Sequence, residues 1–290
     1  TNLPRFPPSG RAGARLGAHR ARGGRRMAGE RGGDQRAGDP IAWDWVAELY
    51  DTYVTTTLDL PFYLGQASGL TGEALELMCG TGRVSIPLAE VGVRLTCVDA
   101  SAGMLARLRQ KLARRPAAAR NITVIQTDVR DLALDRQFNL ILLPFHSFSE
   151  LTAEEDQRRV LANVAGLLRA GGRFICPLHN PPVRHTTLDG LPRLVGRFPL
   201  GAGQLHIWSA ASYDPATRIA DGAQYYEEYD AAGTMLHKRQ LPIRFALLGH
   251  EQFEAMALDV GLRVAALYGD YAHAPFEPES SPFQVWILTK

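Results

Sequence analysis

The sequence predicts an α/β fold built on a doubly wound, largely parallel sheet. Between residues 73 and 183, short apolar segments alternate with helix-like segments, which is the pattern of βαβ units. A glycine turn follows the first apolar segment, and acidic residues follow the next two. The chain has 290 residues, of which 46% are hydrophobic, so it is long enough to bury the core that such a sheet needs.

The N-terminal residues 1–40 differ in composition from the rest of the chain. They contain nine Arg and three acids and show no hydrophobic periodicity, so we expect a disordered Arg/Gly-rich tail. Three interpretations fit such a start: a transit peptide, an arm that binds nucleic acid, or translated sequence ahead of the true start, since Met27 lies inside it. Apolar residues at helical spacing begin at Ile41, and we expect N-terminal lid helices over residues 41–72.

Residues 73–183 form the predicted core of the fold. Apolar runs of strand length alternate there with amphipathic stretches of helix length, and each strand–helix–strand unit places two strands in parallel. The expected strands are 74–78, 94–98, 122–126, 138–143 and 173–177, and the expected helices are 84–91, 102–114 and 154–168.

The pattern changes after the fifth strand. Residues 184–246 have the pattern of strands joined by Asp-Pro and Ala-Ala-Gly turn signals, which predicts an antiparallel cap inserted into the core. Residues 247–290 are expected to return to the core with one helix and the last two strands. The expected strands of the cap are 204–213, 219–229 and 234–245, and those of the final segment are 262–268 and 283–288, after a helix at 250–260.

Charge and cysteine content restrict the function. The whole chain carries a net charge of +2 and residues 1–40 carry +6, so the remainder carries −4. Nucleic-acid binding rests on a basic surface, and this balance argues against RNA or DNA as the substrate. Three cysteines without metal-ligand spacing favour a reducing, cytoplasmic setting. The longest apolar runs are far shorter than the ~20 residues of a membrane span, and we expect a monomer or a homodimer.

The most informative motif surrounds the first glycine turn. The strand at 74–78 contains one acid, Glu76, and runs into Cys-Gly-Thr-Gly with glycines at 80 and 82. Glycine lets the backbone approach a ligand closely at the carboxyl end of the first strand, where open α/β sheets bind nucleotides. The next strand ends at Asp99, which is placed to accept hydrogen bonds from both hydroxyls of a ribose.

A third acid, Asp128, follows the third strand. Its carboxylate is placed to accept a hydrogen bond from an adenine amino group, so three acids after three strands predict one nucleoside site. A dinucleotide dehydrogenase is the competing interpretation, because it has a similar first strand and ribose acid. Two features argue against it: the turn lacks the third glycine of the dinucleotide fingerprint, and a carboxylate at Glu76 would not favour a nearby pyrophosphate.

Taken together, Glu76, Gly80, Gly82, Asp99 and Asp128 resemble the class I S-adenosylmethionine-dependent methyltransferases, most clearly over residues 41–180. The resemblance implies a Rossmann-like, seven-stranded, doubly wound sheet with an N-terminal lid helix and a small antiparallel insertion. It also implies that S-adenosylmethionine is the cofactor and that Glu76 helps to hold its amino group. The cofactor contacts that it implies are Tyr50, Glu76, Cys79, Gly80, Gly82, Asp99, Ala100, Met104, Asp128, Val129 and Pro144.

The fourth strand ends in Pro-Phe-His-Ser-Phe, and the resemblance places His146 beside the transferring methyl group. Many relatives have Asn at this position. His146 has two interpretations: a general base that takes a proton from the attacking atom, or a histidine that orients the loop or packs against the cofactor. We also expect Tyr63, Phe145, His179 and Tyr226 to contact the substrate. Arg83 is a candidate partner for the cofactor's carboxylate or a solvated helix residue.

The predicted function is methyl transfer to N, O or C of a small-molecule acceptor by in-line displacement. The sequence contains no His, Cys, Asp and Glu cluster with metal-ligand spacing, so we expect a metal-independent enzyme. Two alternatives remain: a regulatory or assembly subunit that binds the cofactor without catalysis, and an RNA methyltransferase supported only by the Arg-rich tail. A cavity that is open beside His146 favours the enzyme, whereas one filled by Phe145, Phe148 or Trp208 favours the binding subunit.

Overall fold

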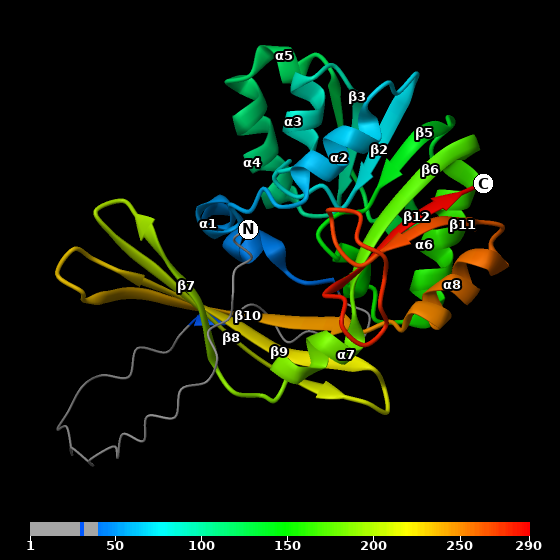
Figure 1. Cartoon of the computed structure of the whole chain (residues 1–290). Coiled ribbons are helices and arrows are strands. Elements are labelled where there is room, and N and C mark those ends of the chain that lie inside the picture. Colours follow the sequence, from blue (N-terminus) through cyan, green and yellow to red (C-terminus); the bar gives the residue numbers. More distant parts are fainter. Residues whose placement is uncertain (1–29, 32–39) are drawn as a thin grey trace.

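The structure, a computed structural model, describes residues 30–31 and 40–290 and contains two sheets (Figure 1). The larger sheet has seven strands in the order β11-β12-β6-β5-β2-β3-β4. All pairings from β4 to β6 are parallel, and β12 runs antiparallel to both β6 and β11. The predicted Rossmann-like, seven-stranded sheet is therefore confirmed. Its strands are β2 Glu73–Leu77, β3 Arg94–Asp99, β4 Ile122–Gln126, β5 Phe138–Leu142, β6 Leu168–His179, β11 Arg263–Tyr268 and β12 Phe283–Thr289.

Helices cover both faces of this sheet (Figure 1). One face carries α2 Leu60–Ala67, α3 Ser85–Glu90, α4 Ala102–Ala113 and α5 Pro116–Ala119, and the other carries α6 Glu154–Leu167 and α8 His250–Asp259. The apolar side chains of α4 at positions 104, 105, 108 and 112 recur at helical spacing and are buried. Ser101 caps this helix by accepting a hydrogen bond from the backbone N–H of Met104 at 3.0 Å, which satisfies one of the free donors of the first turn.

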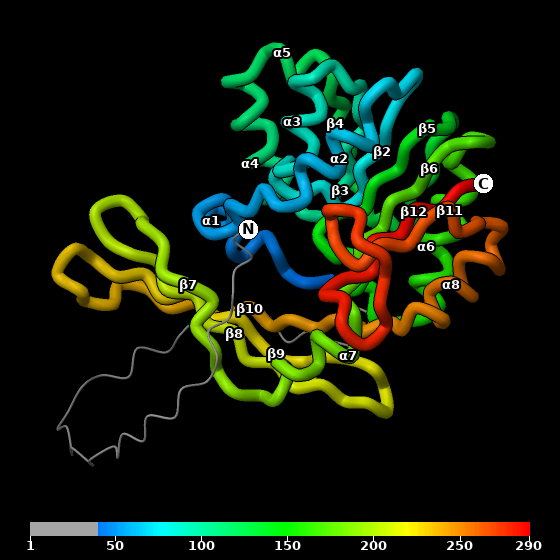
Figure 2. The backbone as a smooth tube through the Cα atoms, viewed as in Figure 1, coloured from blue at the N-terminus to red at the C-terminus, as the bar shows by residue number. Residues whose placement is uncertain are grey.

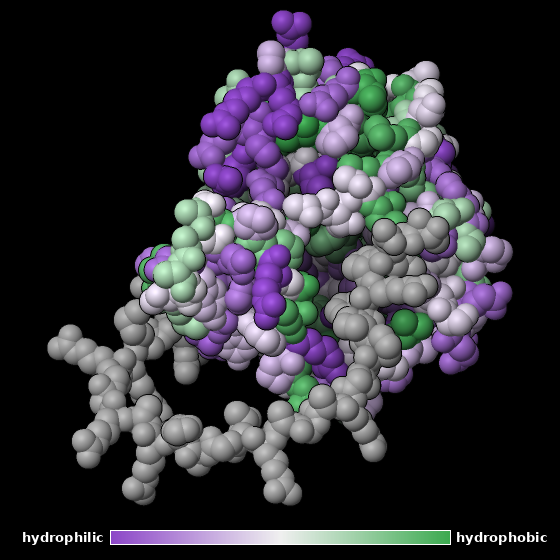
Figure 3. Space-filling model, turned by 60° about the vertical axis from the view of Figure 1, so that its left-hand side comes forward, coloured by the Kyte–Doolittle hydropathy of each residue, from purple (hydrophilic) through white to green (hydrophobic). Residues whose placement is uncertain are grey.

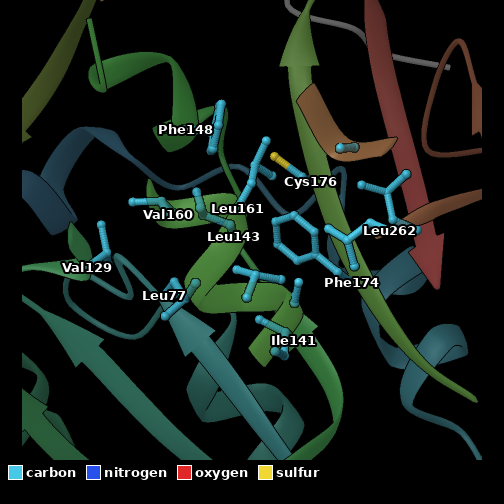
Figure 4. Packing of buried hydrophobic residues seen from close by; sticks show 14 of the residues in the cluster. Leu77, Val129, Ile141, Leu143, Phe148, Val160, Leu161, Phe174, Cys176 and Leu262 are labelled. Carbon is cyan, nitrogen blue, oxygen red and sulfur yellow. The ribbon is translucent and has the colours of Figure 1, made fainter. Parts of the chain in front are cut away.

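The two faces of the sheet bury separate hydrophobic clusters. Beneath α6 and α8, the fully buried Phe138, Phe174 and Trp286 pack with leucines and valines of the helices. Figure 4 shows part of this cluster, into which Phe148 also projects from the segment after β5. Because the apolar strands are buried on both faces, the sheet is a rigid support for the loops at its edge. The outer surface near α4 and α5 is mostly hydrophilic (Figure 3).

The second sheet lies beside the core in the order β1-β10-β9-β8-β7. Strands β7 to β10 form an antiparallel meander, and β1 pairs with β10 in parallel. It joins the core through α7 Pro181–Arg184 and the 3-10 helix His185–Thr187. The cap contains one strand that the sequence-based prediction omits, β7, whose Gly196 and Pro199 suggest a loop. This strand lies at the sheet's edge, where proline is tolerated. The strands are β1 Glu30–Arg31, β7 Arg193–Leu200, β8 Gly203–Asp214, β9 Ile219–Tyr229 and β10 Met235–Ala246.

The N-terminal helix lies between the two sheets (Figure 2). A 3-10 helix, Trp43–Val46, leads into α1 Ala47–Tyr53, and Val46 and Leu49 pack against Leu205 and Ile207 of the cap. Of the tail for which we expect disorder, Glu30–Arg31 pair in parallel with β10, and the remainder up to residue 39 lies outside the described residues. Within the described part of the chain, no helix has the length and apolarity to cross a membrane.

Candidate active site

The glycine turn after β2 is tied to the end of β3 through Asp99. One carboxylate oxygen of Asp99 accepts the backbone N–H of Gly80 at 2.7 Å, and the other accepts that of Ser101 at 2.9 Å. Burial raises the pKa of Asp99, and these two N–H groups offset part of the rise. The side chain therefore fixes the turn and the start of α4 relative to each other, at the carboxyl edge of the sheet.

The two glycines of the turn are required for different reasons. Gly80 has a φ of +55°, and a Cβ there would meet no atom within 4 Å, so its backbone borders open space. Gly82 has a φ of +81°, and a Cβ there would lie 2.4 Å from a methyl group of Leu108. Gly80 thus leaves room for a ligand, whereas Gly82 lets the turn pack against α4.

A cavity of about 270 Å³ lies at this edge of the sheet. It is next to the point where strand order reverses between β2 and β5, which is where open α/β sheets bind their ligands. One end of the cavity is walled by residues that follow β3 and β4. These are Asp99, Ala100, Met104, Asp128 and Val129, all of them predicted cofactor contacts, and Tyr50 of α1 and Gly80 also line the cavity.

Asp128 is held by its neighbour Arg130. The guanidinium of Arg130 donates to both carboxylate oxygens of Asp128, at 3.0 and 2.7 Å, and to Asp156 at 3.1 Å. Burial alone would raise the pKa of Asp128, but the hydrogen bonds and charge of Arg130 bring it below its usual value. A carboxylate has about four lone-pair sites, so Asp128 retains capacity for a further donor.

Glu150 is a carboxyl group of the cavity that the sequence-based prediction missed. Burial raises its pKa to about 7, although Trp43 donates its indole N–H to Oε2 at 3.0 Å. Glu150 and Trp43 both line the cavity. The signal was present in the sequence, because Glu150 follows the same strand as His146 by only a few residues.

The segment after β5 enters the cavity in an unusual backbone conformation. Phe145 and His146 have φ values of 60° and 62°, in the left-handed region that L residues with large side chains avoid. Met78, which precedes the glycine turn and also lines the cavity, has a φ of 53°. Strained backbone of this kind persists where the surrounding structure holds it, and it often occurs at functional sites.

His146 stacks on His179, with ring centroids 4.0 Å apart, and its ring centroid lies 4.9 Å from that of Phe283. Burial lowers the pKa of His146 to about 4, and burial also lowers the pKa of His179. The Nδ1 atom of His146 is buried without a hydrogen-bond partner among the described residues, so it is available to a ligand, as an acceptor in the tautomer that is protonated on Nε2.

Glu76 and Arg83 have partners within the protein. Glu76 is buried and accepts a hydrogen bond from the Ser85 hydroxyl at 2.6 Å. Burial raises its pKa to about 8. Arg83 forms a two-pronged ion pair with Asp59 at 2.5 and 2.6 Å, and its guanidinium carbon lies 4.8 Å from the centroid of the Phe145 ring. Arg83 is therefore engaged with Asp59 and does not line the cavity.

The structure separates the predicted site residues into two groups. Phe145 and His179 line the cavity with His146 and the nucleoside-end residues. Tyr63 of α2 is fully buried in the core, where its ring packs against that of Tyr271. Tyr226 of cap strand β9 is fully buried between the cap and the N-terminal helix, where its hydroxyl contacts that of Tyr53. The predicted site residues outside the cavity lining are Tyr63, Glu76, Cys79, Gly82, Pro144 and Tyr226.

The sequence pattern could not separate Tyr63 and Tyr226 from core residues, because aromatic residues at helix or strand spacing fit the core equally well. Neither Phe148 nor Trp208 fills the cavity: Phe148 belongs to the hydrophobic core, and Trp208 donates its indole N–H to Glu227 at 3.0 Å. The described residues contain no group of three or more His, Cys, Asp or Glu that would hold a metal ion.

Comparison with known proteins identifies the family. A family model described as a methyltransferase domain matches residues 74–172, the segment that contains the glycine turn, Asp99, Asp128 and His146. Residues 74–172 therefore form a methyltransferase domain, of the class I kind that uses S-adenosylmethionine. Its cofactor is S-adenosylmethionine, and the open backbone at Gly80 together with the carboxylate of Asp99 suits an adenosyl group.

The methyltransferase resembles several characterised proteins along most of its length. It is 29% identical over 209 residues to a cypemycin N-terminal methyltransferase from Streptomyces sp, covering 71% of this chain and 78% of that protein. It is 25% identical to a glycine/sarcosine N-methyltransferase from Parasynechococcus marenigrum, covering 74% and 71% of the two chains. The CcbJ methyltransferase from Streptomyces caelestis shares the fold, with a TM-score of 0.73 at 22% identity over 86% of this chain and 98% of that one.

Proposed function

We propose that the methyltransferase methylates an amine nitrogen of a small molecule, without a metal ion. The observation that carries this proposal is the cavity itself, which has nucleoside-type residues at one end and the neutral His146 and His179 at the other. The two relatives described above, a cypemycin N-terminal methyltransferase and a glycine/sarcosine N-methyltransferase, both have names that specify nitrogen, which supports nitrogen over oxygen or carbon.

The residues at the nucleoside end suit the cofactor. Asp99 would accept the ribose hydroxyls, and Asp128 with the adjacent Val129 backbone would bind the adenine ring, against which Met104 packs. Gly80 and Tyr50 would face the methionine portion. Glu76 would act through the turn, because it is bonded to Ser85 and does not line the cavity.

Bound S-adenosylmethionine supplies a sulfonium methyl group that is already activated for transfer. The protein then has to hold an amine lone pair in line with that methyl group and exclude water. The methyl group would pass from sulfur to nitrogen, with the S–CH₃ bonding pair remaining on sulfur and the surplus amine proton passing to solvent water after the transfer.

His146 is suited to position the amine. With a pKa of about 4 its imidazole is neutral at physiological pH, so it does not repel an approaching substrate, and Nδ1 is left to accept an amine N–H. A group of such low pKa is a weak base. We therefore assign His146 the role of orienting the lone pair rather than that of removing a proton from an alcohol.

The non-catalytic alternative predicts a cavity blocked on the acceptor side. The cavity extends past His146 to His179 and the cap strands, which favours the enzyme. The RNA methyltransferase alternative rests on the Arg-rich tail, which lies largely outside the described residues.

A labelling experiment tests the proposal. The full chain is incubated with methyl-labelled S-adenosylmethionine and matched amines, alcohols and thiols, and products are located by mass spectrometry, with Asp99→Ala as the inactive control. We expect the label on nitrogen. Label confined to oxygen or carbon would contradict the acceptor assignment. Tight binding of S-adenosylhomocysteine without transfer to any amine would favour the binding subunit.

A further inference from the structure

Arg184 is a partly buried cation of the cavity lining that the proposed function leaves unexplained. It ends α7, directly after the chain leaves the core sheet, and it lines the cavity together with His146 and His179. Its Nη1 donates to the Thr187 hydroxyl at 2.5 Å, and its guanidinium carbon lies 5.6 Å from the centroid of the Phe245 ring.

No carboxylate compensates this charge within the described part of the chain. None of the ion pairs found there involves Arg184, and its Nε is buried without a hydrogen-bond partner. The neighbouring Arg193, in contrast, is paired with Asp189 at 2.6 Å. A partly buried guanidinium whose Nε is buried without a partner and which has no counter-charge is unfavourable, so its position in the cavity lining points to a charge that arrives with a ligand.

A second donor faces the same space from the cap. Gln224 of β9 lines the cavity, and its Oε1 accepts the Tyr226 hydroxyl at 2.7 Å. The Tyr226 hydroxyl is in turn in contact with that of Tyr53, at 3.0 Å. Because the Oε1 atom of Gln224 accepts from Tyr226, the NH₂ group of the same amide is left to donate to a ligand. On β8, Ser209 is the register partner of Gln224 and also lines the cavity.

His146 and His179 add no charge to this end of the cavity. Burial lowers the pKa of both His146 and His179, so they are neutral at physiological pH. The acidic residues of the lining, Asp99, Asp128, Glu150 and Asp156, follow β3, β4 and β5 or begin α6, whereas Arg184 and Gln224 come from α7 and the cap. The cavity therefore has an acidic wall for the nucleoside and a donor-rich wall for the acceptor.

We propose that the methyl acceptor carries an oxyanion, a carboxylate or a phosphate, and that Arg184 binds this group with help from the amide of Gln224. The proposal rests on the proposed function, because it specifies the acceptor of the same transfer. A guanidinium matches the two oxygens of a carboxylate or phosphate in one plane. Binding the oxyanion there would anchor the acceptor at one end, while its amine reaches His146 at the other.

The test measures anion binding to the full chain saturated with S-adenosylhomocysteine. Acetate and inorganic phosphate are titrated by calorimetry at constant ionic strength, with their uncharged analogues acetamide and trimethyl phosphate as references. The variants are Arg184→Gln, Arg184→Lys and the matched control Arg197→Gln, because Arg197 is exposed on β7 and outside the cavity lining.

We expect the wild type and Arg197→Gln to bind acetate or phosphate and not the uncharged analogues. Arg184→Gln should weaken binding about tenfold or more, as expected for one charge-assisted hydrogen bond, and Arg184→Lys should be intermediate. Preference between acetate and phosphate identifies the oxyanion.

Equal anion affinity in wild type and Arg184→Gln, or no binding of either anion to the wild type, would overturn the proposal. Unchanged affinity for S-adenosylhomocysteine shows that a variant is folded, and Arg184→Lys replaces Arg184→Gln if the latter is not. If the wild-type chain does not bind S-adenosylhomocysteine at all, the proposed function itself is refuted.

Discussion

Replacing Asp99 should weaken both the fold of the turn and the affinity for the cofactor. In Asp99→Ala the backbone N–H groups of Gly80 and Ser101 lose their acceptors, at a cost of about 1–3 kcal/mol each where they stay buried. Two ribose hydroxyls lose a charged acceptor as well, which is worth about 3 kcal/mol together, or roughly a hundredfold in Kd. Urea denaturation measures the first effect, and calorimetric titration with S-adenosylhomocysteine measures the second.

Asp99→Asn separates charge from shape. Its amide keeps one acceptor oxygen but turns an NH₂ group toward one of the two backbone donors, so both stability and affinity should fall, by less than in the alanine variant. Asp135→Asn, a change at an exposed position, is the control and should alter neither. If both Asp99 variants lose stability but bind S-adenosylhomocysteine within about threefold of the wild type, Asp99 holds the turn and does not bind the ribose.

Three further predictions concern stability, pH and metals. Arg83→Met leaves Asp59 buried without a partner and should lower the free energy of unfolding by about 3 kcal/mol. The control Arg115→Met breaks an exposed pair and should lower it by under about 1 kcal/mol. Equal losses in the two variants would contradict a structural role for the Arg83–Asp59 pair. Because burial lowers the pKa of His146 to about 4 from about 6.5 in the unfolded chain, the unfolded state takes up a proton first as pH falls. The contribution of neutral His146 to the free energy of unfolding is complete above pH ~6.5, and about 2 kcal/mol of it is lost by pH ~5. Between these two pH values, urea denaturation should show a smaller loss of stability for His146→Asn than for the wild type. An equal loss in both proteins would argue against a depressed pKa of His146. Methyl transfer should proceed unchanged in EDTA, and a rate that falls and is restored by Mg²⁺ would contradict a metal-independent reaction.

The parts of the site that stand at the ends of successive parallel strands, and therefore at one edge of the sheet, were predictable. The glycine turn, Asp99 and Asp128 each follow a strand or end one, and the carboxyl ends of parallel strands meet at one edge. The seven-stranded sheet followed from the same alternation of strands and helices. Boundaries differ by a few residues because apolar runs fade gradually at the ends of elements.

The contribution of α7 and the cap to the acceptor side was not predictable, because it depends on how the cap docks, whereas Phe145, His146 and His179 were predicted and line the cavity. Arg184 precedes the cap strands and has the pattern of an ordinary helix or loop residue, and Gln224 has that of an exposed strand position. Only the docked sheet brings them to one cavity. Tyr226 illustrates the converse: its sequence pattern suited a substrate contact, but the packing of α1 against the cap buries it next to Tyr53.

The most direct test of the account is a calorimetric titration of the wild-type chain with S-adenosylmethionine, S-adenosylhomocysteine and NAD. We expect both adenosyl compounds to bind to one site per chain and NAD not to compete, because the turn that contains Gly80 and Gly82 lacks the third glycine of a pyrophosphate-binding loop. Binding of NAD in preference to both adenosyl compounds would contradict the account and favour a dinucleotide-dependent enzyme.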